Sequence, residues 1–81
     1  MSEHEKTVEI TVNGKPVKVR GPTATGAEIK AAAIAQGVRI EPNFVLQEEL
    51  PNGTSRIVGD GDVVHLHPHV RFTAIKPDDN S

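Results

Sequence analysis

An Asn-Gly pair between two alternating segments is the feature that most constrains how this chain can fold. Residues 7–12 alternate apolar and polar side chains, as do residues 17–19 after Asn13-Gly14, and a period of two is typical of half-buried strands. Asn-Gly suits a type I′ turn, because both turn positions need a positive φ. The spacing therefore predicts a tight β-hairpin with a fixed register. Its expected cross-strand pairs are Val8 with Val19, Glu9 with Lys18 and Ile10 with Val17.

A helix is predicted soon after the hairpin, which ends at Gly21-Pro22. Thr25 and Glu28 have the spacing of a capping box, in which each side chain binds a free backbone amide of the first turn. Residues 26–36 are mostly fair to good helix formers, and Gly37 supplies a left-handed stop. The sequence therefore predicts a helix of about three turns at ~3.6 residues per turn.

Short strands are expected after the helix. Turn-forming residues separate the apolar runs, and the predicted strands cover residues 44–46, 56–58 and 63–66. A hairpin, a helix and further strands can form one mixed sheet with the helix packed across it and the first and last strands parallel in the middle. The prediction is an α+β fold of the β-grasp type, with Pro16 placing the second strand at a sheet edge. A split βαβ arrangement would start with a single strand, so the hairpin argues against it.

The 81 residues leave room for one domain. We expect a disordered N-terminal segment over residues 1–6, the β-grasp domain over residues 7–69 and a C-terminal tail over residues 70–81. Only two aromatic residues are present, Phe44 and Phe72, so the core must be mainly aliphatic. Phe44 is expected to be part of that core.

Composition excludes several functions. The formal charge is −2 and no basic block occurs, which argues against nucleic acid as a partner. No apolar run reaches the ~18 residues of a membrane span, and the polar opening lacks the apolar stretch of a signal peptide, so a cytoplasmic protein is expected. The chain has no cysteine, no Ser-His-Asp arrangement and no evident carboxylate pair, so we expect neither an enzyme nor a cofactor.

Two features near the end of the chain indicate a binding surface. His65 and His67 alternate with core positions and are expected to face solvent, forming a recognition surface beside the tail; a metal site that also includes His69 is the alternative. Residues 70–75 alternate without an obvious partner. Either they dock into an enzyme through Phe72, with Arg71 as an exposed charge, or they form a further strand at the sheet edge.

The motifs in this order resemble those of bacterial multiubiquitin-type domains, a family of ubiquitin-like proteins. The resemblance spans residues 8–76. The residues that carry it are Ile10-Thr11-Val12-Asn13-Gly14-Lys15-Pro16-Val17, Thr25-Gly26-Ala27-Glu28-Ile29-Lys30-Ala31-Ala32-Ala33 and Asp62-Val63-Val64-His65-Leu66-His67.

This resemblance implies a protein modifier that partners attach or remove through its C-terminus. The implied partners are an E1-like adenylating enzyme, an E2-like carrier and a deubiquitinase-like metallopeptidase, and the target protein stays unidentified. The adenylating enzyme would activate the tail carboxylate with ATP, because a free carboxylate is a poor electrophile. The implied conjugation tail consists of Asp78, Asp79, Asn80 and Ser81.

The tail departs from the Gly-Gly ending of ubiquitin, whose missing side chains let it enter a narrow channel. Three alternatives stay open. The enzymes have a wider channel, or a peptidase removes Ser81 and exposes Asn80, or the domain is a β-grasp interaction module that is never conjugated. Which lysine could accept a second copy is also open among Lys6, Lys15, Lys18, Lys30 and Lys76.

Overall fold

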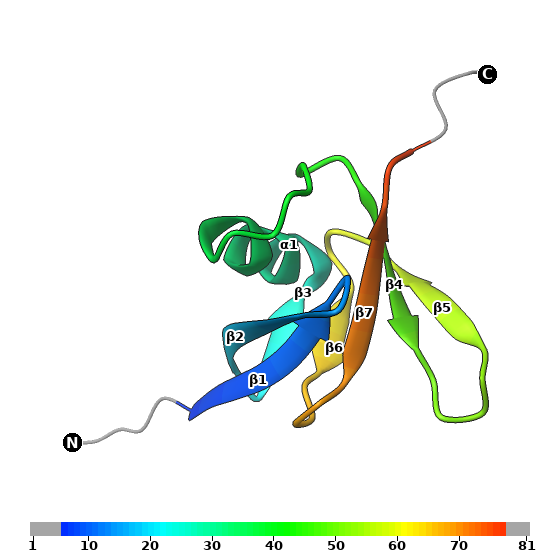
Figure 1. Ribbon diagram of the computed structural model, residues 1–81. Coiled ribbons are helices and arrows are strands. Elements are labelled where there is room, and N and C mark those ends of the chain that lie inside the picture. The colour runs from blue at the N-terminus through cyan, green and yellow to red at the C-terminus, as the bar shows by residue number, and fades with distance from the viewer. Residues whose placement is uncertain (1–5, 78–81) are drawn as a thin grey trace.

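The computed structural model describes residues 6–77, which form a five-stranded mixed sheet, a two-stranded sheet and one helix packed across them (Figure 1). The large sheet has the strand order β2-β1-β7-β4-β5, and the small sheet pairs β3 with β6. This is the β-grasp arrangement that the sequence predicts. The elements are β1 (Lys6–Val12), β2 (Lys15–Gly21), β3 (Thr23–Thr25), α1 (Gly26–Ala35), β4 (Val45–Glu49), β5 (Ser55–Val58), β6 (Val63–His65) and β7 (Arg71–Ile75).

The β1–β2 hairpin has the predicted register. Val8 lies opposite Val19, and Glu9 lies opposite Lys18. Both turn residues have positive φ, 53° at Asn13 and 80° at Gly14, as a type I′ turn requires. β2 is an edge strand, so the prediction based on Pro16 is confirmed.

Helix α1 begins with the predicted capping box. Thr25 N–H donates to Glu28 Oε1 at 2.8 Å, and Glu28 N–H donates to Thr25 Oγ1 at 3.2 Å. Gly37 follows the helix with a φ of 100°, the left-handed conformation expected after a helix end. At ten residues, α1 is neither long nor apolar enough to cross a membrane, and residues 6–77 hold no helix that is.

The core between α1 and the sheet is mainly aliphatic, as the composition predicts. Its largest fully buried side chains are Phe72, Ile10, Ile29, Leu46, Val12, Val17 and Val64. Phe44 is partly buried and packs against this cluster. The one fully buried aromatic ring is therefore at a position that we placed outside the domain.

The middle of the sheet differs from the prediction. The strand expected at residues 63–66 pairs with β3 and not with β1. β7 is the strand that lies parallel to β1, with Thr11 opposite Arg71 and Val12 opposite Phe72. The domain thus extends to Ile75, beyond the boundary predicted at residue 69, because the alternation of residues 70–75 directs two side chains into the core.

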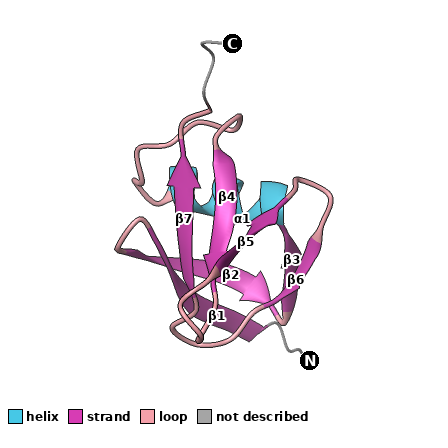
Figure 2. Cartoon of the chain, turned by 90° about the vertical axis from the view of Figure 1, so that its right-hand side faces the viewer, coloured by secondary structure: helices cyan, strands magenta, loops and turns pink. Residues whose placement is uncertain are grey.

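Strand β1 starts at Lys6, one residue before the predicted start of the domain at residue 7. Residues 1–5 lie outside the described residues. Figure 2, turned by 90° from Figure 1, shows β7 and β4 side by side with α1 behind them.

Candidate functional site at the end of strand β7

Strand β7 occupies the centre of the large sheet, and the chain leaves the domain at its carboxyl end. β1 lies on one side of β7 and β4 on the other. Because β1 and β7 are parallel, β7 ends at the side of the sheet opposite the start of β1, as Figure 1 shows. Whatever follows Ile75 in the sequence starts from a position fixed by two neighbouring strands.

On the β1 side, Asn13 holds β7 beyond the point where β1 ends. The Asn13 N–H donates to the Phe72 carbonyl oxygen at 3.0 Å, which continues the parallel ladder. The side chain then exchanges two hydrogen bonds with one residue: Ala74 N–H donates to Asn13 Oδ1 at 2.8 Å, and Asn13 Nδ2 donates to the Ala74 carbonyl oxygen at 3.2 Å. A side-chain amide therefore takes the place of the strand residue that the turn removes.

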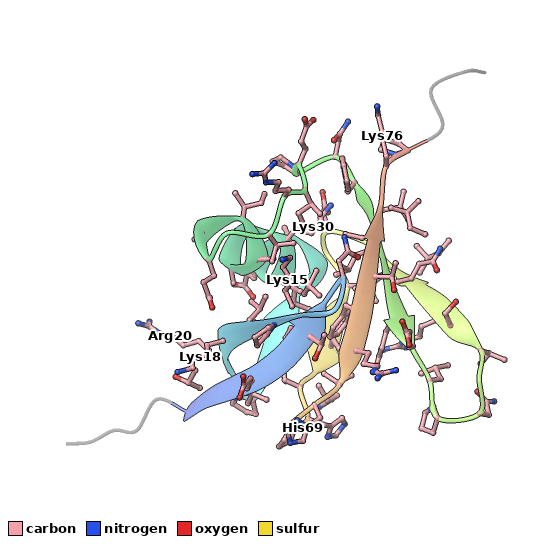
Figure 3. The ribbon with its side chains drawn as sticks, viewed as in Figure 1. Lys15, Lys18, Arg20, Lys30, His69 and Lys76 are labelled. Carbon is pink, nitrogen blue, oxygen red and sulfur yellow. The ribbon has the colours of Figure 1, made fainter. Side chains whose placement is uncertain are left out.

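On the β4 side, the last cross-strand pair is Val45 with Ile75. Both side chains lie on the sheet face away from α1, since Leu46 and Ala74, their neighbours in the two strands, are buried. Ile75 is 43% exposed. The exit thus carries a small apolar patch, made of Val45 and Ile75, followed by the exposed Lys76 at the upper end of the molecule in Figure 3.

The four residues predicted to form the conjugation tail lie outside the described residues. Asp78, Asp79, Asn80 and Ser81 follow Pro77, the last residue described. What the structure locates is the segment that precedes them.

A model of the multiubiquitin family matches residues 8–78. The match includes most of the hairpin, the helix and all of β7. The chain belongs to the multiubiquitin family. No curated protein and no solved structure matches the chain. Family membership and the β-grasp sheet together identify a ubiquitin-like domain, as the sequence motifs predict.

In this multiubiquitin domain, Phe72 is not a docking residue. The ring is 1% exposed, lies on the central strand and packs into the core, so the interpretation of Phe72 as a partner-recognition residue is wrong. The alternative, a further strand, is correct for residues 71–75. The strand is central, however, and not at the sheet edge where we expected it.

Two other predicted recognition residues, His67 and Arg71, lie near the start of β7, at the end opposite Ile75. Arg71 starts the strand and is separated from Ile75 by ~13 Å along it, at ~3.3 Å per residue. His67, His69 and Arg71 line one groove together with Glu49, and Figure 3 shows His69 and Lys76 at opposite ends of the molecule. His65 is exposed on β6. All three predicted residues are exposed, and the groove with His67 and Arg71 lies at the end of the molecule opposite Lys76.

The histidines do not assemble a metal site in the part of the chain that the structure describes. Their alternation ends at Pro68, and His69 has a φ of 69°. Over residues 6–77, no group of three or more potential metal ligands is brought together.

Lys30, one of the five lysines left open as attachment points, is a buried charge. Its Nζ donates to the carbonyl oxygens of Pro42 at 2.6 Å and Phe44 at 2.8 Å. The same atom forms a 2.8 Å ion pair with Asp60 Oδ1. All three ammonium N–H groups thus have an acceptor. The residue is only 5% exposed, so Lys30 is not accessible as an attachment point for a second copy.

Proposed function

We propose that this multiubiquitin domain is a protein modifier of a bacterial ubiquitination-like pathway. Its C-terminus is processed, adenylated by an E1-like enzyme and transferred to an E2-like carrier or to a target. A deubiquitinase-like metallopeptidase trims the precursor or removes the modifier. Membership of the multiubiquitin family supports a ubiquitin-like role, and the proposed steps extend that role to the chemistry of the tail.

The observation that carries the proposal is the position of the last residue of β7. Six residues, 76–81, follow Ile75 in the sequence, and a fully extended segment of this length spans up to ~20 Å at ~3.3 Å per residue. A compact domain followed by such a segment suits an enzyme whose active site lies in a channel. The Val45–Ile75 patch offers that enzyme an apolar contact next to the exit.

The chemistry follows from the poor reactivity of a carboxylate. A carboxylate oxygen of the tail attacks the α-phosphorus of ATP, and pyrophosphate leaves. A thiolate of the carrier then attacks the carbonyl carbon of the acyl-adenylate, and AMP leaves with the pair of electrons of the broken bond. The modifier contributes the carboxylate, while the nucleophile and the activating groups belong to its partners.

The ending Asp78-Asp79-Asn80-Ser81 bears directly on the proposal. It lacks the Gly-Gly that would pass a narrow channel, and this difference favours a second candidate, a β-grasp interaction module that is never conjugated. Trimming of Ser81, which would make Asn80 the acyl donor, reconciles the tail with conjugation.

The two candidates differ in a measurable mass. The full chain is incubated with ATP, a candidate E1-like enzyme and a candidate E2-like carrier, with and without a candidate deubiquitinase-like metallopeptidase. The expected result is a carrier adduct that hydroxylamine cleaves, with the mass of the carrier plus the chain minus water, where the chain is either intact or shortened by Ser81. Non-covalent association without any adduct, in either sample, would favour the interaction module.

A further inference from the structure

Strand β5 leaves one edge of the large sheet open. The Leu50 N–H donates to the Thr54 carbonyl oxygen at 2.8 Å, and hydrogen-bonded pairs alternate along an antiparallel ladder. Arg56 and Val58 therefore bond to β4, whereas the backbone N–H and C=O groups of Ser55 and Ile57 point away from the sheet. Among the described residues, no strand pairs with these four groups.

The opposite edge, β2, is blocked at Pro16 and at Lys18. By the same alternation, the backbone groups that point away from β1 belong to Pro16, Lys18 and Arg20. Proline has no N–H to offer. The side chain of Gln36, which follows α1, binds both backbone groups of Lys18. Lys18 N–H donates to Gln36 Oε1 at 2.9 Å, and Gln36 Nε2 donates to the Lys18 carbonyl oxygen at 2.7 Å. The fold thus blocks one sheet edge with specific groups and leaves the other accessible.

A second open edge flanks the same surface as β5. Leu66 N–H donates to the Pro22 carbonyl oxygen at 2.8 Å and Gly26 N–H to the Asp62 carbonyl oxygen at 3.2 Å. This register directs the backbone groups of Val63 away from β3. One groove joins the two edges, and we call it the β5–β6 groove; Figure 2 shows both strands on the face toward the viewer. It is lined by Arg56, Ile57, Val58, Asp62, Val63 and Val64.

The side chains of the β5–β6 groove define what can occupy it. Ile57 is 68% exposed and Val63 is 61% exposed, more than any other large aliphatic side chain in residues 6–77. Arg56 Nε donates to Glu48 Oε1 at 2.9 Å. Among residues 6–77, no hydrogen-bond partner is found for its two terminal amino groups. Asp62 Oδ2 already accepts the Gly59 N–H at 2.8 Å. The groove thus offers strand-pairing groups, two aliphatic contacts and one half-used guanidinium.

We propose that the β5–β6 groove binds an extended segment of a partner protein, which adds to the edge of β5 as a further strand. Two aliphatic residues of that segment contact Ile57 and Val63, and an acidic residue between them faces Arg56. A second copy of this chain is a poor occupant. A four-residue edge buries far less than the ~1,200 Å² of a stable dimer, and a symmetric pairing centred on Arg56 would oppose two like charges. This inference does not depend on conjugation.

The probe is a blocked pentapeptide with the sequence Thr-Val-Glu-Val-Thr, titrated into the ¹⁵N-labelled full chain. The expected result is a set of amide shifts confined to Ser55–Val58 and Val63–His65, with slower hydrogen exchange at the Ile57 amide. A peptide with Lys in place of Glu should bind about threefold more weakly, the size of one exposed ion pair. Ile57→Lys should abolish the shifts. The matched control Ile34→Lys, a substitution at an exposed position of α1, should retain them.

Three outcomes would overturn the proposal. In the first, millimolar peptide leaves the β5 amides unchanged or shifts β2 instead. In the second, the β5 shifts depend on protein concentration without peptide, which would assign the edge to a second copy. In the third, the Ile57 amide is already protected and becomes exposed when residues 78–81 are removed, which would assign it to the chain's own end.

Discussion

The side-chain amide of Asn13 exchanges two hydrogen bonds with the backbone of Ala74, across 61 positions of sequence. β1 turns away at this point, and the amide supplies the donor and the acceptor that the next strand residue would have supplied. The same device recurs at the β2 edge, where the Gln36 amide binds both backbone groups of Lys18. One amide fixes the strand that leads to the tail, and the other closes an edge.

Asn13→Asp tests the first contact. A carboxylate can still accept from the Ala74 N–H but cannot donate to its carbonyl oxygen, so we expect a loss of about 1–2 kcal/mol in the free energy of unfolding. Hydrogen exchange at the Ala74 amide should become faster. Asn13→Gly, which keeps the positive φ of the turn, should expose the same amide. Unchanged protection of Ala74 in both variants would contradict the role assigned to Asn13.

Gln36→Ala should free the Lys18 edge. The expected cost is about 1 kcal/mol, since two hydrogen bonds at an exposed site are replaced by bonds to water. Exchange at the Lys18 amide, followed by NMR, is the decisive readout. Gln36→Glu retains only the acceptor and should give an intermediate rate. If the Lys18 amide in Gln36→Ala stays as protected as in the parent chain, the blocked-edge interpretation is wrong.

Lys30→Met should be strongly destabilising. The substitution leaves two carbonyl oxygens without their donor, and Asp60, which stays largely exposed, can return to water. We therefore expect the free energy of unfolding to fall by about 2–3 kcal/mol, which is less than the loss for breaking a fully buried ion pair. Lys15→Met at the exposed hairpin should change stability by less than about 0.5 kcal/mol. Urea unfolding measures both variants, and similar midpoints would contradict the account.

Acylation of the folded chain gives an independent test of Lys30. An acylating reagent has to reach the lysine nitrogen, and the three hydrogen-bond acceptors around the Lys30 Nζ restrict access to that atom. Peptide mapping after brief labelling should find Lys15 and Lys76 modified well before Lys30. Equal rates at all three positions would show that the burial is not maintained in solution.

Phe72→Ala should cost about 3–5 kcal/mol, the usual loss for a buried aromatic side chain. Phe44 is only partly buried, so Phe44→Ala should cost less, at most about 2 kcal/mol. Thermal or urea unfolding compares the pair. A larger loss for Phe44→Ala would place the centre of the core elsewhere.

Local patterns predicted the elements whose partners are close in sequence. The Asn13-Gly14 turn determined the hairpin register, and the capping residues determined where α1 begins, because both depend on residues within a few positions. β7 was misplaced for the opposite reason. Its alternation was visible, but its partners are β1, β4 and the distant side chain of Asn13, and no local period encodes these contacts. Phe72 therefore looked like an exposed anchor.

Lys30 shows the same limit. A lysine on a helix usually faces water, and its burial depends on the 42–44 loop and on Asp60 folding over it. Both segments lie outside the helix and follow it in sequence. The tail residues could be identified from the sequence only through the family resemblance, and the strand that leads to them had to be located in the structure.

ATP–pyrophosphate exchange by a candidate E1-like activating enzyme tests the proposed function most directly. The assay compares chains that end at Ser81, at Asn80 and at Asp78. We predict exchange with at least one of the two longer chains and none with the shortest, whose carboxylate no longer reaches the nucleotide. Equal exchange with all three chains would contradict the account, as would no exchange with any of them by an enzyme that is active on another ubiquitin-like substrate.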